Sequence, residues 1–198
     1  MPGFYNCNNG ILATNGSQVR IDKKTNFFNT TNVALGVAEN SILQAINASG
    51  SSAAAGSTIN INNSAFGVQL SASTAIVQGA QIQNSRVGFG AFKGSKFNFD
   101  YSVVVGQGIT NAQNYGVLAD EGSFGTVYGT SVSGHTGGTG SGTGGNYKTT
   151  NGSVVLVGSS TQSNQTNTQG LYAGIVAIDP NLGSRNVFYP YVSTLFDI

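Results

Sequence analysis

Two short phrases recur along this chain, and their recurrence restricts the possible fold more than any single segment does. The first phrase is Gly-Ser, one further residue and then alternating apolar residues; it occupies residues 16–22, 94–100 and 122–128, and Gly56 and Gly152 begin similar runs. The second phrase is a glycine followed by a short apolar stretch. It begins at Gly10, Gly36, Gly67, Gly90, Gly116 and Gly170. Self-similarity at intervals of about 20 to 50 residues is typical of solenoids and repeat arrays.

The repeats are unequal in length. If Gly36, Gly67, Gly90 and Gly116 begin successive units, these units are 31, 23 and 26 residues long. A stack of coils tolerates such variation, because each coil contacts only its neighbours and extra residues leave the stack as loops. We therefore expect about three short strands per coil, hydrogen bonds that run along the stack, and Gly or Asn at turn positions with a positive φ.

Alternation of apolar and polar residues predicts many short β-strands. Clear examples are residues 19–21, 59–61, 68–70, 97–99, 117–119 and 175–177. The best helical candidate, residues 34–48, is interrupted by Asn40 and Ser41, so we expect no helix there. The predicted fold class is all-β.

The composition is that of an ordered and nearly uncharged protein. Gly, Asn, Ser and Thr form close to half of the chain, charged residues form 8%, and the net charge is +1. With 39% hydrophobic residues, the chain has the apolar surface for a core that disordered chains lack. We therefore expect no nucleic-acid partner and no membrane insertion. The single cysteine, Cys7, allows no intramolecular disulfide and is expected to pack as a small apolar residue.

Segments 63–70 and 115–123 combine a turn, a glycine and an alternating apolar strand. In this pattern, over about residues 9–178, the chain resembles right-handed parallel β-helices of the pectate-lyase-like kind, as found in bacteriophage tailspikes, tail fibres and related virion surface proteins. The resemblance implies a right-handed parallel β-helix (solenoid) of irregular coils of roughly 21–31 residues. It also implies a symmetric homo-oligomer, with a homotrimer favoured. A fold alone does not determine a function.

The chain divides into a stack of coils, residues 1–178, and a C-terminal segment, residues 179–198. Within the stack, the Gly-rich residues 134–146 are expected to form a long surface loop, with strands resuming at residues 154–157. The C-terminal segment is densely aromatic. We expect it to cap the solenoid or to contact another subunit, because stacked coils leave unpaired edges at both ends.

The candidate catalytic residues are acids, since glycoside hydrolysis needs two carboxyl groups at a defined separation. Asp100 and the neighbours Asp120 and Glu121 come about one coil apart, and they are the candidates if the protein is a glycoside hydrolase or lyase that acts on host polysaccharide. The alternative is structural, because Asp22 and Asp100 occupy the same place in their repeats, as expected of residues that cap turns. We favour this alternative and expect a protein without enzymatic activity.

Aromatic side chains are the candidates for contact with a sugar, since a ring face packs against a pyranose. Four tyrosines near turns, together with the histidine of the Gly-rich loop, form the candidate set: Tyr101, Tyr115, Tyr128, Tyr147 and His135. The alternative is that the rings pack in the core or between subunits. We expect neither a metal nor a cofactor, because no acidic cluster and no complete phosphate-binding motif is present.

The composition, the coil pattern and the lack of a recognisable secretory signal peptide together favour a structural protein on a virion surface. We expect a bacteriophage tail-fibre or tailspike component that recognises a host-surface polysaccharide and contacts copies of itself and other virion proteins. Three alternatives stay open. They are a capsid decoration (cement) protein, a polysaccharide-cleaving enzyme, and a fragment of an exported bacterial adhesin.

Overall fold

The computed structural model describes residues 3–21, 24–46, 59–106, 114–135, 144–158, 168–170 and 174–179. Within these ranges the chain forms eighteen strands and no helix, which confirms the predicted all-β class. The helical candidate at residues 34–48 is instead occupied by parts of two strands as far as residue 46. It follows that the described residues contain no helix that is long and apolar enough to cross a membrane.

The strands pair in parallel and form two sheets. The eleven-stranded sheet contains β1 (Gly3–Tyr5), β2 (Asn9–Ala13), β4 (Thr25–Ala38), β6 (Ile59–Ser71), β8 (Gln81–Gln83), β9 (Val87–Phe92), β11 (Val103–Val105), β12 (Asn114–Ala119), β14 (Ser131–Ser133), β15 (Gly144–Thr149) and β17 (Thr168–Gly170). The seven-stranded sheet contains β3 (Gln18–Ile21), β5 (Ile42–Ala45), β7 (Thr74–Gln78), β10 (Lys96–Asp100), β13 (Phe124–Tyr128), β16 (Val154–Gly158) and β18 (Ile175–Asp179).

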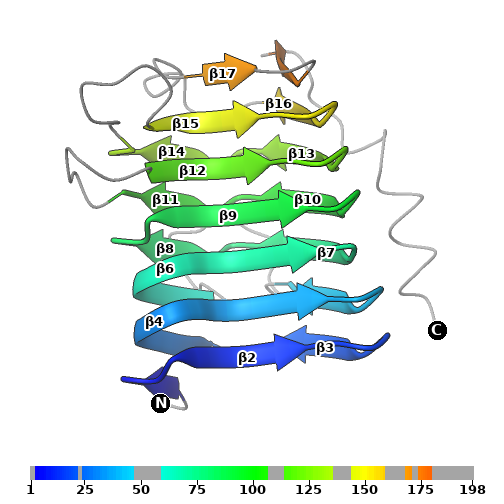
Figure 1. Cartoon of the computed structure of the whole chain (residues 1–198). Coiled ribbons are helices and arrows are strands. Elements are labelled where there is room, and N and C mark those ends of the chain that lie inside the picture. The colour runs from blue at the N-terminus through cyan, green and yellow to red at the C-terminus, as the bar shows by residue number, and fades with distance from the viewer. Residues whose placement is uncertain are drawn as a thin grey trace.

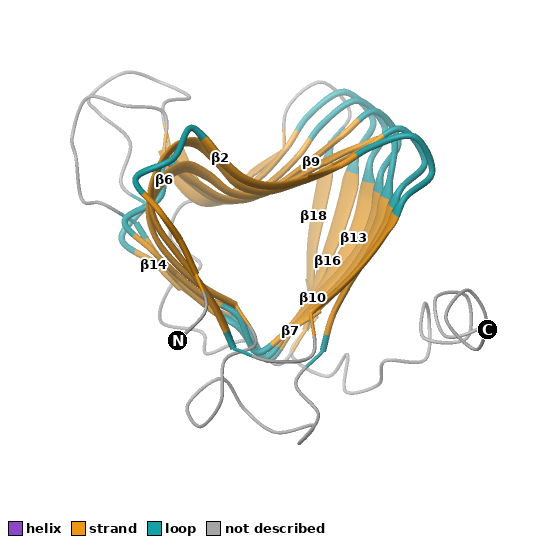
Figure 2. Ribbon diagram, turned by 90° about the horizontal axis from the view of Figure 1, so that it is seen from below, coloured by secondary structure: helices purple, strands orange, loops and turns teal. Residues whose placement is uncertain are grey.

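The two sheets make three walls around one core, and they surround it almost completely (Figure 2). The long strands β4 and β6 bend through a corner, so that β6 pairs with β8 through residues 60–62 and with β9 through residues 66–71. The first wall therefore contains β2, β9, β12, β15, β17 and the second halves of β4 and β6. The seven-stranded sheet is the second wall, and the third wall contains β1, β8, β11, β14 and the first halves of β4 and β6.

The chain visits the three walls in order and then begins the next level, so that successive circuits lie one above another (Figure 1). The strand register shows this on the second wall, where the following residues occupy equivalent places: Gln18, Ile42, Thr74, Lys96, Phe124, Val154 and Ile175. A circuit therefore takes between 21 and 32 residues. This arrangement is compatible with a parallel β solenoid.

The glycines that begin the apolar phrases do not all occupy one place, which corrects the division into units. Gly36 and Gly90 are equivalent, since both pair with Gln69. Gly116, in contrast, lies two residues before the partner of Gly90, Leu118. A Cβ on Gly116 would lie 2.1 Å from Val132 Cγ1, so this glycine lets the first and third walls approach closely. A Cβ on Gly36 would instead lie 2.6 Å from Cδ2 of Leu12, its partner in the neighbouring circuit, so the two places require glycine for different steric reasons.

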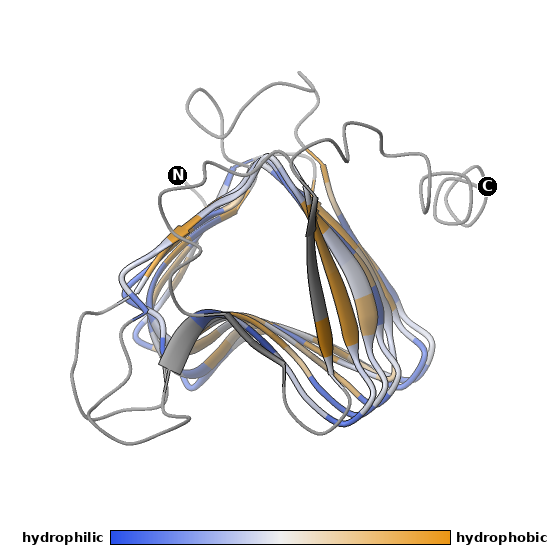
Figure 3. Ribbon diagram, turned by 90° about the horizontal axis from the view of Figure 1, so that it is seen from above, coloured by the Kyte–Doolittle hydropathy of each residue, from blue (hydrophilic) through white to orange (hydrophobic). Residues whose placement is uncertain are grey.

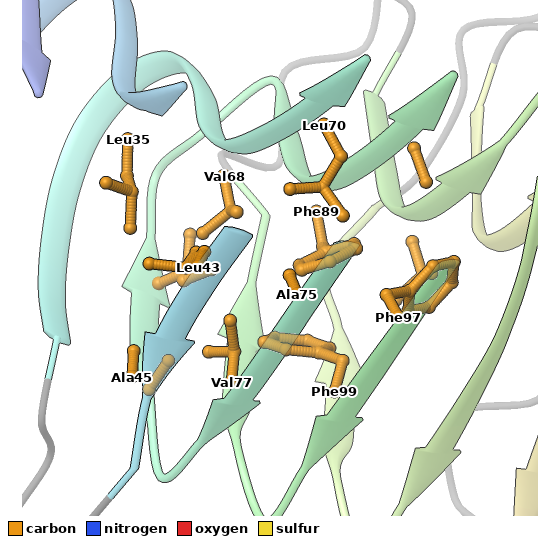
Figure 4. Packing of buried hydrophobic residues seen from close by; sticks show 14 of the residues in the cluster. Leu35, Leu43, Ala45, Val68, Leu70, Ala75, Val77, Phe89, Phe97 and Phe99 are labelled. Carbon is orange, nitrogen blue, oxygen red and sulfur yellow. The ribbon is translucent and has the colours of Figure 1, made fainter. Parts of the chain in front are cut away.

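The core is a continuous column of apolar side chains that point inward from all three walls. In the middle of the stack, Phe89 of the first wall meets Phe97 and Phe99 of the second, with both pairs of ring centroids 4.7 Å apart (Figure 4). Small residues stand beside these rings, and a Cβ on Gly125 would lie 2.4 Å from the Phe97 ring. Hydrophobic colour accordingly follows the walls, while hydrophilic colour gathers at corners (Figure 3).

Strand β15 and the C-terminal segment bear on two of the predicted segment boundaries. The Gly-rich stretch 134–146 was expected to be a loop throughout, but its last three residues begin β15, which the sequence pattern did not predict. Strand pairing between β15 and β12 outweighs the low strand propensity of Gly144 and Gly145. The expected C-terminal cap, apart from its first residue, Asp179, lies outside the described residues.

Candidate binding surfaces at the corners

The turns between the first and second walls form the serine corner: residues 14–17, 38–41, 71–73, 92–95, 120–123 and 150–153. Each turn ends in a serine, and all of these serines except Ser17 are buried. Hydroxyl groups accept hydrogen bonds from the backbone of the serine one circuit earlier, as Ser123 does from Ser95 at 3.2 Å and Ser153 does from Ser123 at 3.0 Å. This ladder supports the turns, which carry exposed residues on their outer side.

Asp120 acts as a hydrogen-bond acceptor within the serine corner. Its Oδ1 accepts from the Glu121 backbone N–H at 2.7 Å, from Asn151 Nδ2 at 2.7 Å, and from the Thr150 hydroxyl. Burial raises the pKa of Asp120, but these hydrogen bonds and the charge of Lys148 outweigh burial and hold the pKa below its ordinary value. The ionised carboxylate thus joins the turns of two neighbouring circuits.

The turns between the second and third walls form the aspartate–tyrosine corner: residues 78–80, 100–102 and 128–130. Asp100 is buried here, and its Oδ1 accepts a hydrogen bond from the backbone N–H of Tyr128 at 3.1 Å. Asp100 therefore holds the next circuit in place, in agreement with the structural role that its place in the repeat predicted. Asp22, the other member of that comparison, lies outside the described residues.

Tyr101 occupies an unusual backbone conformation at this corner. Its φ is 49°, in the left-handed region that bulky residues rarely adopt. The equivalent residues one circuit away are Gly79 and Gly129, and a Cβ on Gly129 would lie 2.8 Å from Cδ1 of Tyr101. The Tyr101 ring meets the Tyr128 ring edge to face, with centroids 5.4 Å apart. Both rings are half-buried, so they present a pair of partly exposed aromatic surfaces on a rigid turn.

The structure does not bring Asp100 to Asp120. Asp100 ends β10, whereas Asp120 lies in the turn that leads to the start of β13, and Lys96 and Phe124 begin these neighbouring strands in register. The two acids are therefore separated by about the length of a five-residue strand, roughly 13 to 16 Å. Paired carboxyl groups of glycoside hydrolases lie about 5 to 9.5 Å apart. Glu121 adjoins Asp120 in sequence and is exposed.

Tyr115 and Tyr147 belong to the first wall and are buried. Lys148 Nζ donates a hydrogen bond to Tyr115 Oη at 2.8 Å and lies 4.5 Å from the centroid of that ring. Tyr147 is a member of the hydrophobic core. For these two residues the structure agrees with the alternative that the ring packs inside, and only Tyr101 and Tyr128 of the predicted tyrosines keep exposed ring surface.

His135 also differs from its expected place in an exposed loop, because only 1% of its surface is exposed. A Cβ on Gly116 would lie 3.2 Å from its Nδ1, and neither ring nitrogen makes a hydrogen bond of ordinary length and angle, although the Ser133 backbone lies near enough to favour the protonated ring. Burial lowers the pKa of His135 to about 4, and the Ser133 backbone opposes this shift more weakly. The side chain is therefore neutral at pH 7 and does not present a binding surface.

The corner between the third and first walls, which we term the asparagine corner, carries a ladder of amides: Asn6, Asn29, Asn63 and Asn84. All four have a positive φ, which Asn tolerates better than most residues. Asn29 donates to Asn6 Oδ1 at 3.0 Å, and Asn63 donates to Asn29 Oδ1 at 2.9 Å. A hollow of about 320 Å³ lies beside this ladder, with Arg86 in its lining. Asn84, in contrast, donates to Asn62 Oδ1 at 3.0 Å, so the amides of this corner bond to other asparagines.

A second hollow, of about 340 Å³, lies at the serine corner, and we term it the lysine hollow. Its polar lining contains Lys93, Lys96, Asn40, Ser73 and Thr74. This hollow was not predicted from the sequence. The signal that reveals it is a turn that is one residue shorter than its neighbours.

The described residues include no group of three or more His, Cys, Asp or Glu side chains placed to hold a metal ion. No protein-family model, curated protein or solved structure matches this chain. Function is therefore inferred from the fold and from the side chains that the corners present.

Proposed function

We propose that the chain is a structural protein of a virion surface, a right-handed parallel β-helix that displays side chains for recognition of a host-surface polysaccharide, as a tail-fibre or tailspike component. The observation that carries this proposal is the structural role of Asp100 and Asp120. Buried Asp100 and hydrogen-bonded Asp120 each hold turns together, at two different corners. The acids therefore contribute to a rigid scaffold, which favours display over polysaccharide cleavage.

The Tyr101–Tyr128 pair is the proposed sugar-contacting surface. Aromatic rings offer large contact area at low entropic cost, and partly exposed rings on rigid turns are suited to pack against pyranose faces. The left-handed backbone of Tyr101 supports this assignment, because strained residues cluster at binding sites, where the surrounding structure holds them in place. Gly79 and Gly129, at the equivalent places, show that the fold itself requires no aromatic residue here.

The proposed assembly is a homotrimer that also contacts other virion proteins. Large apolar side chains are exposed at the N-terminal end of the stack, where Tyr5 is 53% and Leu12 is 56% exposed. Among the strands that the structure describes, β1, β2 and β3 each pair on one side only. Exposed edges of this kind are normally covered by a partner or another chain segment.

The first experiment is light scattering of the purified chain, followed by a binding assay on the same sample against a panel of bacterial cells and their purified surface polysaccharides. We expect a trimer that binds at least one strain. The double variant Tyr101→Ala/Tyr128→Ala should bind about tenfold more weakly or worse, since ring stacking contributes on the order of 1 kcal/mol per ring.

The matched control is Phe66→Ala/Phe92→Ala, which removes another half-exposed edge-to-face ring pair, with centroids 6.1 Å apart, from the first wall. Equal loss of binding in both double variants would contradict the role of Tyr101 and Tyr128. A monomer that binds no cells would contradict the proposal and favour capsid decoration. Release of reducing ends that disappears in Asp100→Ala/Asp120→Ala/Glu121→Ala would establish an enzyme instead.

A further inference from the structure

The lysine hollow exists because one turn of the serine corner lacks a residue. Three residues separate Ala38 from Ile42, and three separate Phe92 from Lys96, but only two separate Ser71 from Thr74, although these residues are in register. The neighbouring turns contain two consecutive residues with positive φ, for example Lys93 at 56° and Gly94 at 69°. The short turn contains a single one, Ala72 at 48°.

The missing residue leaves space between two full-length turns. Asn40 of the circuit below and Gly94 of the circuit above both line the hollow, and the short turn itself contributes Ala72 and Ser73. Backbone hydrogen bonds still join the three turns, since Asn40 N donates to Ala72 O at 2.7 Å and Ala72 N donates to Phe92 O at 3.1 Å. The space is therefore built into a hydrogen-bonded corner, and its floor is fixed by the ladder that includes Ser73.

The lining of the lysine hollow combines positive charge with neutral hydrogen-bonding groups. The exposed residues Lys93 and Lys96 both line it, together with Asn40 and Thr74. No acid belongs to the lining. Glu121 occupies the place of Lys93 one circuit above, and its backbone oxygen accepts a hydrogen bond from Gly94 N at 2.8 Å. An ammonium group is a compact point charge that attracts carboxylates and other anions, while amides and hydroxyls bind sugar hydroxyls.

The size and the apolar part of the lining indicate what kind of anion fits. A volume of about 340 Å³ lies at the lower end of the usual range for ligand sites, roughly 300 to 1,000 Å³. Ile42 and Ala72 add a small apolar surface, which suits the C–H face of a sugar ring better than a simple inorganic ion.

We propose that the lysine hollow is a subsite for a carboxylate-bearing sugar, such as a uronic or a sialic acid residue of a polysaccharide. This assignment rests on the proposed function and deepens it, because it names the chemical class of the polysaccharide. The hollow lies at a different corner from Tyr101 and Tyr128, so an extended acidic glycan would contact the two surfaces separately.

The test is isothermal titration calorimetry of the full chain with three defined probes: a β-1,4-linked triglucuronate, its neutral analogue cellotriose, and an α2,8-linked trisialic acid. We expect binding of at least one acidic probe, no comparable binding of cellotriose, and weakening by added salt, which screens exposed charges. The proposal would be overturned if neither acidic probe bound. It would also be overturned if trisialic acid failed to bind and triglucuronate bound no more tightly than cellotriose.

Two variants locate the binding. Lys93→Gln/Lys96→Gln should lower the affinity for the acidic probe about tenfold or more, because hydrogen bonds to charged groups contribute strongly to affinity. Insertion of one glycine between Ala72 and Ser73 restores the length of the neighbouring turns and should fill the hollow, with both lysines retained. Arg86→Gln, at the other hollow, is the control and should bind as the unaltered chain does.

Thermal unfolding of each variant shows that loss of binding is not loss of fold. Unchanged affinity in the glycine insertion variant, if it unfolds at the normal temperature, would overturn the assignment to this hollow. The proposed function fails separately: an acidic probe that binds while no cell or purified polysaccharide does would support the subsite and contradict host recognition. Binding of the chain to cells, without binding of either acidic probe, would support host recognition and contradict the subsite.

Discussion

His135 places a titratable side chain in the interior near β14, with only 1% of its surface exposed. Its two ring nitrogens make no hydrogen bond of ordinary length and angle, and the Oγ1 of Thr149 is the other buried side-chain atom without one among the described residues. Both residues lie in the later circuits, near β14 and in β15. An unpaired buried polar group costs on the order of 1 to 3 kcal/mol. These two unpaired groups therefore lower the stability of the later circuits.

This burial makes stability depend on pH. The pKa of His135 is about 4 in the folded state, whereas an unfolded histidine has a pKa of about 6.5. Between these values the unfolded state binds more protons, so the free energy of unfolding falls as the pH drops from about 6.5 to about 4. The expected loss approaches roughly 3 kcal/mol, at about 1.36 kcal/mol per pKa unit. Urea unfolding across this range measures it.

His135→Leu is the control for this dependence, because it removes the titration and keeps an apolar side chain in the core. Its stability should change much less across the same pH range. Asp120 acts at lower pH, because its pKa is lowered in the folded state. Its contribution to the free energy of unfolding is present above the unfolded pKa of about 3.9 and is lost as the pH falls below that value. An unchanged pH slope in His135→Leu would contradict the assignment.

At the scale of the turn, the serine ladder is expected to contribute measurably to stability. Ser123 accepts a hydrogen bond from the Ser95 backbone N–H at 3.2 Å and donates to the Asp120 carbonyl at 2.7 Å, and it is fully buried. Ser123→Ala removes both bonds and leaves the Ser95 N–H with only its longer bond to the Phe92 carbonyl, at 3.3 Å. At about 0.5 to 1.5 kcal/mol per hydrogen bond, it should destabilise the protein by about 1 to 3 kcal/mol. Urea unfolding at constant pH measures the change.

Ser17→Ala is the matched control, because Ser17 is the exposed first member of the same ladder. Its hydroxyl donates to the Thr14 carbonyl, and water can replace that bond. The expected cost is below about 0.5 kcal/mol, as for most surface substitutions. Equal costs at the two positions would show that the ladder contributes little.

The turns of the serine corner could be predicted from the sequence, because their chemistry is local. Gly16, Gly94, Gly122 and Gly152 all have a positive φ near 70°, as the Gly-Ser phrase predicted. Glycine reaches this region at little steric cost, so a recurring glycine before a polar residue is a direct signal of a turn. The alternating strands after these glycines were predicted for the same reason, since their pattern lies within a few residues.

Features that depend on neighbouring circuits could not be predicted in the same way. β15 begins at Gly144 because it pairs with β12, and no local pattern in Gly144 or Gly145 indicates that pairing. The burial of Tyr147 and His135 follows from the position of the whole circuit, not from the residues beside them. The lysine hollow requires a comparison of three turn lengths in register, which becomes possible only when the register is known.

At the scale of the molecule, the core shows how unequal circuits still form one stack. Phe97 is followed in register by Gly125, and Phe89 by Val117, so large and small residues compensate between circuits. Most length differences are taken up between strands, and the second wall keeps a continuous register. One extra residue lies within β4, where its register with β6 shifts between Thr30 and Val33. In an architecture of this kind each circuit contacts mainly its two neighbours, and stability is approximately a sum of circuit and interface contributions.

This arrangement predicts that one whole circuit can be removed. Lys96 and Phe124 are in register and 28 residues apart, so deletion of residues 96–123 joins Ser95 to Phe124 and keeps every turn in its place. We expect the variant to stay folded with a β-type circular dichroism spectrum. It should unfold at lower urea concentration, because Phe89 loses its contacts with Phe97 and Phe99 and a cavity remains.

The control is deletion of residues 96–117, which is of similar size but joins Ser95 to Leu118. Two turns of the serine corner then follow each other almost directly, and the strand of the second wall that normally lies between them is missing. The apolar faces of the later strands therefore no longer match those of the strands below. We expect this variant to lose its cooperative unfolding transition and to be digested rapidly by protease. An unfolded in-register variant, or a folded out-of-register one, would contradict a stack of interchangeable circuits.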